Sequence, residues 1–240
     1  MKKFSYLVPF VLLIAVAACS EQEVSEVSQP QNDEWIVLFD GSSLDHWRGY
    51  NMDRVPTGWD IEGDELVFNP SEDDGGMHGG DIITRDKYGD FELELEWNVS
   101  RAGNSGIFYF ALEQPERAIY WSAPEMQILD NENHPDATRG EDGNRKAGSL
   151  YDLIPADPQN FSGYGEWNTV RIVSQGSHVE HWQNGEKILE YERWTPEWFD
   201  MLHESKFNCY PEFGALREGH IGLQDHGDLV RFRNIRVRPL

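Results

Sequence analysis

Cysteine is scarce in this sequence, which contains only Cys19 and Cys209 in 240 residues. Cys19 lies at the end of a segment with the features of an export signal, where we expect it to be lipidated. Cys209 then has no partner, so an intramolecular disulfide is excluded even in an oxidising compartment. A cysteine-rich metal cluster is excluded for the same reason.

Positive charge is also scarce, because 20 Lys and Arg residues stand against 43 Asp and Glu residues, for a net charge of -23. Loss of Lys2 and Lys3 with an export signal would change this charge from -23 to -25. Such an acidic surface repels nucleic acid and anionic lipid. The composition therefore disfavours a nucleic-acid partner and suits neutral ligands or cations.

Long hydrophobic runs are missing as well. The apolar stretch at residues 6–18 follows Lys2 and Lys3 and is too short for a transmembrane helix, which is typical of a secretion signal. It ends in Val-Ala-Ala-Cys at residues 16–19, which resembles the bacterial lipobox. In that motif the cysteine becomes the lipidated first residue of the mature protein.

The lipobox resemblance implies the organisation of the chain. We expect a signal peptide at residues 1–18, a disordered polar tether at residues 19–33 that begins at lipidated Cys19, and one domain at residues 34–240. The protein would contact the membrane through the lipid alone, as an exported lipoprotein of the outer membrane on its periplasmic or cell-surface face. An ordinary signal peptide with an incidental cysteine is the alternative.

Helical periodicity is rare after residue 34, whereas short strands with turn signals recur throughout. Residues 91–99 alternate apolar and acidic side chains, and Asn184-Gly185 is a strong hairpin signal. One helical insertion is expected at residues 193–213, where Thr195 is a plausible cap and Pro196 takes the first helical position. The pattern predicts an all-β protein, a sandwich or jelly roll of two antiparallel sheets.

Aromatic residues are abundant, with nine Trp, nine Tyr and twelve Phe. Rings of Trp and Tyr pack against the apolar faces of sugar rings, so a carbohydrate-facing surface is one interpretation. Packing in the core is the other interpretation for most of these rings.

One stretch combines packing with chemistry. Residues 124–131 alternate Glu125 and Gln127 with Met126 and Ile128, so a strand here would carry polar groups on one face and packing groups on the other. A solvated strand of a domain without catalytic function also alternates in this way. The polar, Gly-rich loop that follows at residues 131–148 is long enough to suggest a functional or mobile segment.

Six motifs in this order resemble the 3-keto-disaccharide hydrolase domain family, long known only as a domain of unknown function. They lie at residues 38–44, 103–107, 125–131, 165–168, 179–185 and 222–227. The resemblance covers the chain from about Trp35 to the C-terminus. It implies a concanavalin-like jelly roll, a bacterial lipoprotein, and activity on glycosides whose sugar carries a ketone at C3.

Such a substrate allows elimination. A C3 ketone acidifies the proton on C2, and the enolate formed by its loss can expel the group on C1; added water would make the net reaction a hydrolysis. This chemistry requires a base, an acid for the departing oxygen, and donors or a cation at the C3 oxygen.

The family motifs and their neighbours supply candidates for these roles. His181 or His134 is a candidate base, and Glu125 or Asp130 a candidate acid. Because His181 alternates with Val179, a half-buried histidine of the sheet is the alternative interpretation of that residue. Gln127, Asn104, Arg145, Lys206 or a bound cation could stabilise the oxyanion. Further candidates for substrate binding are Tyr109, Trp121, Tyr151, Gln224 and His226.

These motifs identify no cofactor with certainty, and a divalent cation remains an open alternative. The side chains of Glu125, Asp130, His134 and Asp136 are of the types that hold a hard or borderline divalent cation, although their spacing is not diagnostic.

Two other functions compete with elimination. Glu125-x-Gln127-x-x-Asp130 also looks like the Glu-x-Asp-x-x-Glu signature of laminarinase-type retaining glycosidases. That mechanism needs two carboxyl groups about 5 to 5.5 Å apart, which a neutral Gln and a short Asp put in doubt. A non-catalytic surface lipoprotein that only binds glycans is the third interpretation.

Overall fold

The protein is described by a computed structural model at residue 1, residues 34–70 and residues 79–240. The predicted signal peptide, Cys19 and the tether at residues 19–33 lie outside these described residues. Within them, no helix is long and apolar enough to cross a membrane.

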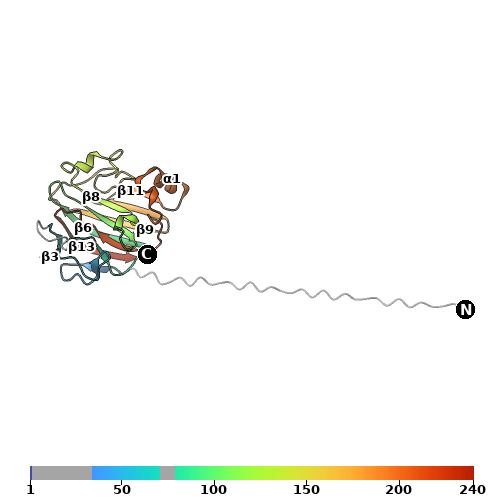
Figure 1. The fold of residues 1–240 in the computed structure, drawn as a ribbon, viewed down its shortest axis with the longest axis horizontal. Helices are drawn as coiled ribbons and strands as arrows, with labels where there is room; N and C mark the ends of the chain where they lie inside the picture. Colours follow the sequence, from blue (N-terminus) through green and yellow to red (C-terminus); the bar gives the residue numbers. More distant parts are fainter. Residues whose placement is uncertain (2–33, 71–78) are drawn as a thin grey trace. The chain divides into compact units, whose positions relative to one another are not determined.

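Two antiparallel sheets form the domain, as predicted (Figure 1). The larger sheet has eight strands in the order β11-β10-β9-β6-β13-β4-β3, and β1 also pairs with β13. These strands are β1 (Ile36–Phe39), β3 (Trp59–Glu62), β4 (Glu65–Phe68), β6 (Phe91–Val99), β9 (Asn168–Gln175), β10 (His178–Gln183), β11 (Glu186–Glu192) and β13 (Val230–Pro239).

The smaller sheet has five strands in the order β2-β5-β12-β7-β8. They are β2 (Trp47–Gly49), β5 (Ile82–Thr84), β12 (His220–Leu223), β7 (Asn104–Ala111) and β8 (Glu125–Leu129). β7 lies inside this sheet and pairs with β12 on one side and with β8 on the other. The alternating stretch at residues 124–131 therefore contains the edge strand β8.

Alternating side chains from both sheets form the core between them. On β6, Leu95 and Trp97 are buried and belong to the same apolar cluster as Met126 and Ile128 of β8. The carboxylate of Glu96, between the two β6 residues, points the other way and pairs with Arg233. This arrangement is the strand alternation read from the sequence, with one face in the core and one face on the surface.

The hairpin between β10 and β11 forms at the predicted Asn184-Gly185 turn. Asn184 has φ 51° and Gly185 has φ 81°, and a two-residue hairpin turn with both central residues at positive φ matches the twist of its strands. The turn sets the register in which His178 pairs with Glu192 and Glu180 pairs with Glu190.

The insertion after β11 contains helix α1 (Pro196–Glu204) and the 3-10 helix η3 (Lys206–Cys209). Thr195 caps α1 by accepting a hydrogen bond from the Trp198 backbone at 3.2 Å, as the sequence predicted. Trp198 is buried and stacks against Tyr191 of β11, so the insertion is packed onto the larger sheet.

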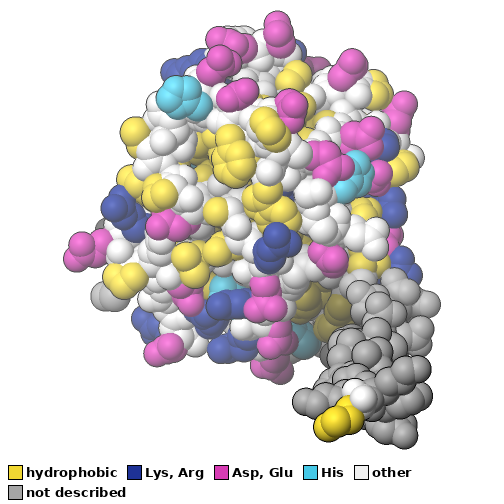
Figure 2. Space-filling view, turned by 90° about the vertical axis from the view of Figure 1, so that its right-hand side faces the viewer, with side chains coloured by type: hydrophobic (Ala, Val, Ile, Leu, Met, Phe, Trp, Pro, Cys, Tyr) yellow, Lys and Arg dark blue, Asp and Glu magenta, His cyan; other side chains and the backbone are white. Residues whose placement is uncertain are grey.

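Two further 3-10 helices, η1 (Ile119–Trp121) and η2 (Pro135–Thr138), lie on either side of β8 in the sequence. Figure 2 shows Asp and Glu side chains spread over one face of the molecule, with Lys and Arg among them. On that face the negative charge of the chain is distributed and does not form one acidic patch.

Candidate active site

A cavity of about 310 Å³ lies where β8, β7 and the end of β12 meet the insertion. Its lining residues come from segments far apart in the sequence, namely Asn104, Tyr120, Ala123, Glu125, Gln127, Tyr151, Lys206, Phe207, Tyr210, Phe213, Gln224 and His226. Seven of them were candidates from the sequence: Asn104, Glu125, Gln127, Tyr151, Lys206, Gln224 and His226. The structure therefore brings most of the predicted substrate-binding set to one place.

Glu125 contributes a buried carboxyl group to this cavity. Its side chain crosses the neighbouring strand at Gly106, where an added Cβ would overlap the Glu125 carboxylate. Glycine is thus required there by the close approach of the side chain. Burial raises the pKa of Glu125 to about 8, and the charges of Asp81 and Asp136 add to the rise, whereas Lys206 opposes it. Near neutral pH the carboxyl group consequently carries its proton.

Gln127 holds the Glu125 carboxyl in place. In the amide orientation that satisfies the neighbouring groups, its nitrogen donates to the Ser105 carbonyl at 3.0 Å and to Glu125 Oε1 at 3.1 Å. Gln127 is a buried residue of β8 two positions beyond Glu125, so both side chains leave the same face of the strand.

Lys206 supplies a cation to the cavity lining. Its ammonium lies 3.3 Å from Asp152 Oδ2 and 4.1 Å from the centre of the Tyr151 ring. The Tyr151 hydroxyl donates to Asp136 Oδ2 at 2.9 Å. Arg145 bridges the two acidic residues, donating to Asp136 at 3.0 Å and pairing with Asp152. This network fixes Tyr151 and Lys206 at the cavity.

Asp136 is the charged centre of that network. Burial works against its ionisation, but the hydrogen bonds from Tyr151 and Arg145 outweigh burial and hold its pKa below the usual value. The loop predicted to be functional or mobile is thus organised around one buried carboxylate in η2. Arg145, a predicted substrate-binding residue, lies behind the cavity lining and acts on it through Asp136 and Asp152.

Two histidines lie together at another part of the site. His226 lines the cavity, and the centre of its ring is 6.3 Å from that of His134. His134 caps η2 by accepting a hydrogen bond from the Asp136 backbone at 3.1 Å, and burial lowers its pKa. Of the two, His226 is the one that contacts the cavity.

Two polar residues of the lining carry buried oxygen atoms without a hydrogen-bond partner among the described residues. Within the described part of the chain, neither Asn104 Oδ1 nor Gln224 Oε1 has a hydrogen-bond partner, although both atoms are buried. A buried acceptor without a partner costs free energy, and a ligand with hydroxyl groups would satisfy it.

An aromatic wall completes the lining, and sequence reasoning missed most of it. Tyr120, Ala123, Phe207, Tyr210 and Phe213 were not among the candidates. Phe207 and Phe213 stack with ring centres 4.0 Å apart. Trp121, a predicted substrate-binding residue, lies behind the lining, and its ring centre is 4.1 Å from that of Tyr210, on which it stacks. The sequence signal for this wall was the density of aromatic residues in the insertion and before β8.

His181 does not reach the cavity, which corrects its assignment as a candidate base. It is fully buried between the sheets, where its Nε2 lies 2.8 Å from the Tyr109 hydroxyl and its Nδ1 lies 3.0 Å from the Gly148 carbonyl. Burial lowers its pKa to about 4. Tyr109, expected to bind substrate, is likewise fully buried and also contacts the Tyr191 hydroxyl at 2.7 Å.

Asp130 is also directed away from the cavity. Its carboxylate accepts hydrogen bonds from the Ala102 backbone at 2.7 Å and from the Asn133 side chain at 2.7 Å. These bonds outweigh burial and keep the pKa of Asp130 low. The residue connects the turns after β8 and before β7, and β8 pairs with β7 in a regular register without a bulge.

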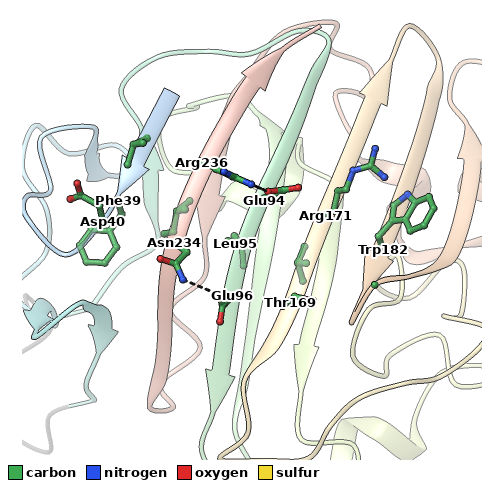
Figure 3. Close-up of a pocket in the computed structure, with 14 residues that line it drawn as sticks. Phe39, Asp40, Glu94, Leu95, Glu96, Thr169, Arg171, Trp182, Asn234 and Arg236 are labelled. Carbon is green, nitrogen blue, oxygen red and sulfur yellow. Dashed lines mark hydrogen bonds and ion pairs between the residues drawn. The ribbon is translucent and has the colours of Figure 1, made fainter. Parts of the chain in front are cut away.

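A larger hollow of about 760 Å³ lies on the outer face of the eight-stranded sheet (Figure 3). Its carboxylates already have partners, since Glu94 pairs with Arg236 at 2.5 Å and Glu96 accepts from Asn234 at 2.7 Å. It contains none of the predicted site residues. The smaller cavity, with its protonated carboxyl group and unpaired acceptors, is the better candidate for the active site.

The predicted metal ligands do not converge in the described residues. Among residues 34–70 and 79–240, the one group of three side chains within metal-binding distance is His178, Glu180 and Glu190, and it lies outside the cavity. Glu125, Asp130, His134 and Asp136 do not form such a group there.

The burial of His181 predicts a structural role that can be measured. His181→Ala should lower the free energy of unfolding by about 2 to 4 kcal/mol, because it opens a cavity, removes one of the two hydrogen-bond partners of the Tyr109 hydroxyl and leaves the Gly148 carbonyl without its His181 partner. Denaturant unfolding measures this change, with His203→Ala on exposed α1 as the control. An unchanged stability together with lost turnover would instead make His181 a catalytic residue.

Comparison with known proteins identifies the family of the chain. Residues 34–238 match the family described as a 3-keto-alpha-glucoside-1,2-lyase-like domain. A 3-keto-disaccharide hydrolase of Bacteroides thetaiotaomicron is 48% identical over 234 residues, which cover 87% of this chain and 79% of that protein.

Solved structures of proteins with similar sequences have the same fold. A crystal structure of a putative glycosyl hydrolase from Parabacteroides distasonis superposes with a TM-score of 0.78 at 28% identity, covering 87% of this chain and 95% of that one. A second such structure from the same organism has a TM-score of 0.65 at 26% identity and covers 86% and 100% of the two chains. The chain therefore belongs to the 3-keto-alpha-glucoside-1,2-lyase-like domain family.

Proposed function

We propose that this protein cleaves 3-keto-disaccharides and related 3-keto-glycosides by eliminating the group on C1. Family membership and the similar hydrolase support a glycoside-cleaving enzyme that acts on such sugars. The observation that carries the mechanism is the buried, protonated carboxyl of Glu125 in a cavity that also holds Lys206.

The reaction begins with removal of the proton on C2, which the C3 ketone acidifies. Electrons of the C2–H bond form the enolate and then the C1–C2 double bond, while the C1–O bond breaks. The departing oxygen takes a proton from an acid, so the products are an unsaturated 3-keto sugar and the free alcohol of the leaving group. Addition of water across the double bond would complete a net hydrolysis.

The cavity offers one side chain for each task. His226 is the exposed imidazole of the lining and serves as the base for the C2 proton. The Lys206 ammonium stabilises the negative charge that develops on the C3 oxygen. Glu125 holds its proton near neutral pH and gives it to the departing oxygen. The unpaired oxygens of Asn104 and Gln224 accept hydrogen bonds from sugar hydroxyls.

The composition of the cavity disfavours the retaining-glycosidase alternative. Among the described residues that line it, Glu125 is the only one with a carboxyl group, whereas the retaining mechanism needs a second one as nucleophile. The aromatic wall suits a sugar ring or a planar leaving group in either mechanism.

Substrate choice is the first test. The purified protein should turn over a 3-keto-glucoside and leave the plain glucoside intact, and a substrate deuterated at C2 should react more slowly. Turnover of the plain glucoside would support the retaining glycosidase, and binding of both sugars without turnover would support a glycan-binding protein.

Substitution of the proposed acid is a separate test. Glu125→Gln should lower kcat about 10² to 10⁴-fold with an unchanged thermal midpoint, because it removes the acid.

The pH dependence is the second test. Because Glu125 must be protonated to act as the acid and its pKa is about 8, kcat/KM should fall as the pH rises through about 8. Lys206 lowers this pKa, so Lys206→Met should move the alkaline limb to higher pH while reducing the rate. A rate that increases through pH 8 would show that Glu125 acts as a base.

We also propose that Cys19 is lipidated and anchors the exported protein to the outer membrane, on the sequence evidence of its lipobox. Cys19→Ala should release the protein from the membrane fraction into the soluble fraction of cells and leave turnover unchanged. If Cys19→Ala stays in the membrane fraction, another segment anchors the protein.

A further inference from the structure

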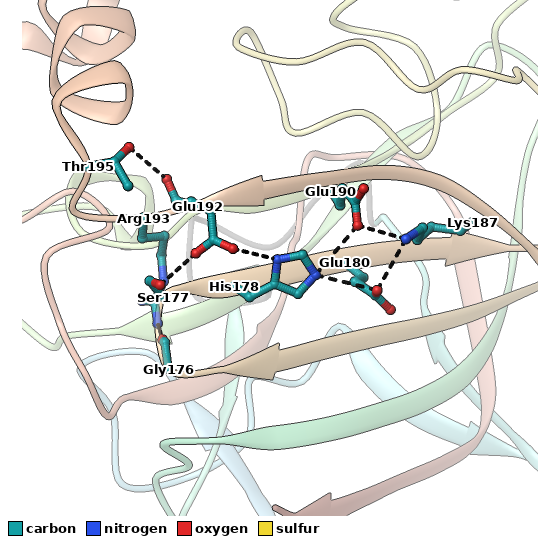
Figure 4. Close-up of polar contacts among 9 residues, drawn as sticks. All are labelled: Gly176, Ser177, His178, Glu180, Lys187, Glu190, Glu192, Arg193 and Thr195. Atoms are coloured by element: carbon teal, nitrogen blue, oxygen red, sulfur yellow. Dashed lines mark hydrogen bonds and ion pairs between the residues drawn. The ribbon is translucent and has the colours of Figure 1, made fainter.

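A histidine and two carboxylates meet on the outer face of the β10–β11 hairpin (Figure 4). His178 Nε2 lies 3.4 Å from Glu180 Oε1 and 3.5 Å from Glu190 Oε2, and the three ligand atoms all lie within 4.8 Å of one another. Around a tetrahedral ion with bonds of about 2.1 Å, neighbouring ligand atoms are separated by about 3.4 Å. The two histidine distances have the spacing of a metal site.

Neighbouring residues already orient two of these ligands. His178 Nδ1 lies 2.8 Å from Glu192 Oε1, and Ser177 Oγ donates to the other oxygen of that carboxylate at 2.5 Å. In the tautomer that carries its proton on Nδ1, directed at Glu192, the Nε2 lone pair faces the cluster. A carboxylate on the second ring nitrogen is the usual support of a metal-bound histidine.

Glu180 is fixed in the same way from outside the cluster. The indole of Trp182 donates to Glu180 Oε2 at 2.7 Å, which leaves Oε1 directed towards His178. His178 and Glu180 belong to β10 and Glu190 to β11, and Glu180 and Glu190 are partners in the antiparallel register. The ligands thus stand on paired strands, which place them more precisely than loops would.

A cation already occupies the space between the carboxylates. Lys187 Nζ lies 2.7 Å from Glu190 Oε2 and 3.3 Å from Glu180 Oε1, the same oxygens that face His178. Among the described residues, Lys187 is the one lysine or arginine that pairs with Glu180 or Glu190. The long lysine side chain can leave without disturbing the strands.

We propose that His178, Glu180 and Glu190 form a binding site for a divalent cation of the zinc type, which displaces Lys187. One imidazole nitrogen with two carboxylate oxygens is a ligand set that zinc accepts, and water would complete the coordination because the site is open to solvent. This site is separate from the catalytic cavity and does not depend on the function proposed for it.

The position of the site indicates a structural role. β11 ends at Glu192 and continues through Thr195 into α1 and η3, which bring Lys206 and Phe207 to the cavity wall. An ion that joins β10 to β11 would hold the hairpin at the root of this insertion. Binding should therefore raise thermal stability more than it changes turnover.

Titration of the full protein with zinc chloride tests the site. We expect one equivalent to bind, the thermal midpoint to rise with zinc concentration, and the fluorescence of Trp182 to change; Trp182→Phe identifies that signal. His178→Ala should weaken binding at least 10-fold. Lys187→Met should tighten binding, because it removes the competing cation.

Two controls keep the experiment decisive. His203→Ala alters an exposed histidine of α1 outside the cluster and should bind zinc as the unmodified protein does. Glu190→Gln replaces His178→Ala if the latter does not fold, and it should also weaken binding at least 10-fold. The proposal is overturned if no single equivalent binds, if binding survives both substitutions of the ligands, or if Lys187→Met leaves the affinity unchanged.

Discussion

The site depends on the burial of one carboxyl group, that of Glu125, on a strand whose other face belongs to the core. Met126 and Ile128 fill the space between the sheets, so the register of β8 cannot slip without moving both of them. Glu125 is therefore held against β7, where only glycine at position 106 leaves room. Since burial favours the neutral acid, the same packing that fixes the side chain also keeps its proton in place.

Charge in the rest of the site is arranged to leave Glu125 neutral while supplying one cation. Arg145 is neutralised by Asp136 and Asp152, and the latter also holds Lys206 at 3.3 Å. Lys206 thus approaches the cavity as part of a balanced network and remains outside direct contact with a carboxylate of the lining. A strong ion pair with Glu125 would have ionised it and removed the acid that elimination needs.

Strand periodicity predicted the two sheets, the hairpin at Asn184-Gly185 and the polar face of β8, because each is a local pattern. The same periodicity indicates that the side chain of His181 is buried. It shares its face of β10 with Val179, and both are buried, whereas His178, at odd spacing from them, lies on the outer face. The alternation with Val179 therefore indicates a histidine of the core face, which is the other interpretation that the sequence allowed for His181.

The aromatic content of the sequence suggested a sugar-facing surface, but the residues of the aromatic wall could not be identified, since the wall joins residues that are distant in the sequence. Tyr120 precedes β8 and Tyr210 follows η3, and only the packing of α1 through Trp198 onto Tyr191 of β11 brings the insertion over the smaller sheet. The inner face of the β10–β11 hairpin therefore packs against the core, and the chain continues from the end of β11 into the insertion that forms part of the cavity wall. A cation bound on its outer face would act on the active site through this connection and would need no contact with substrate.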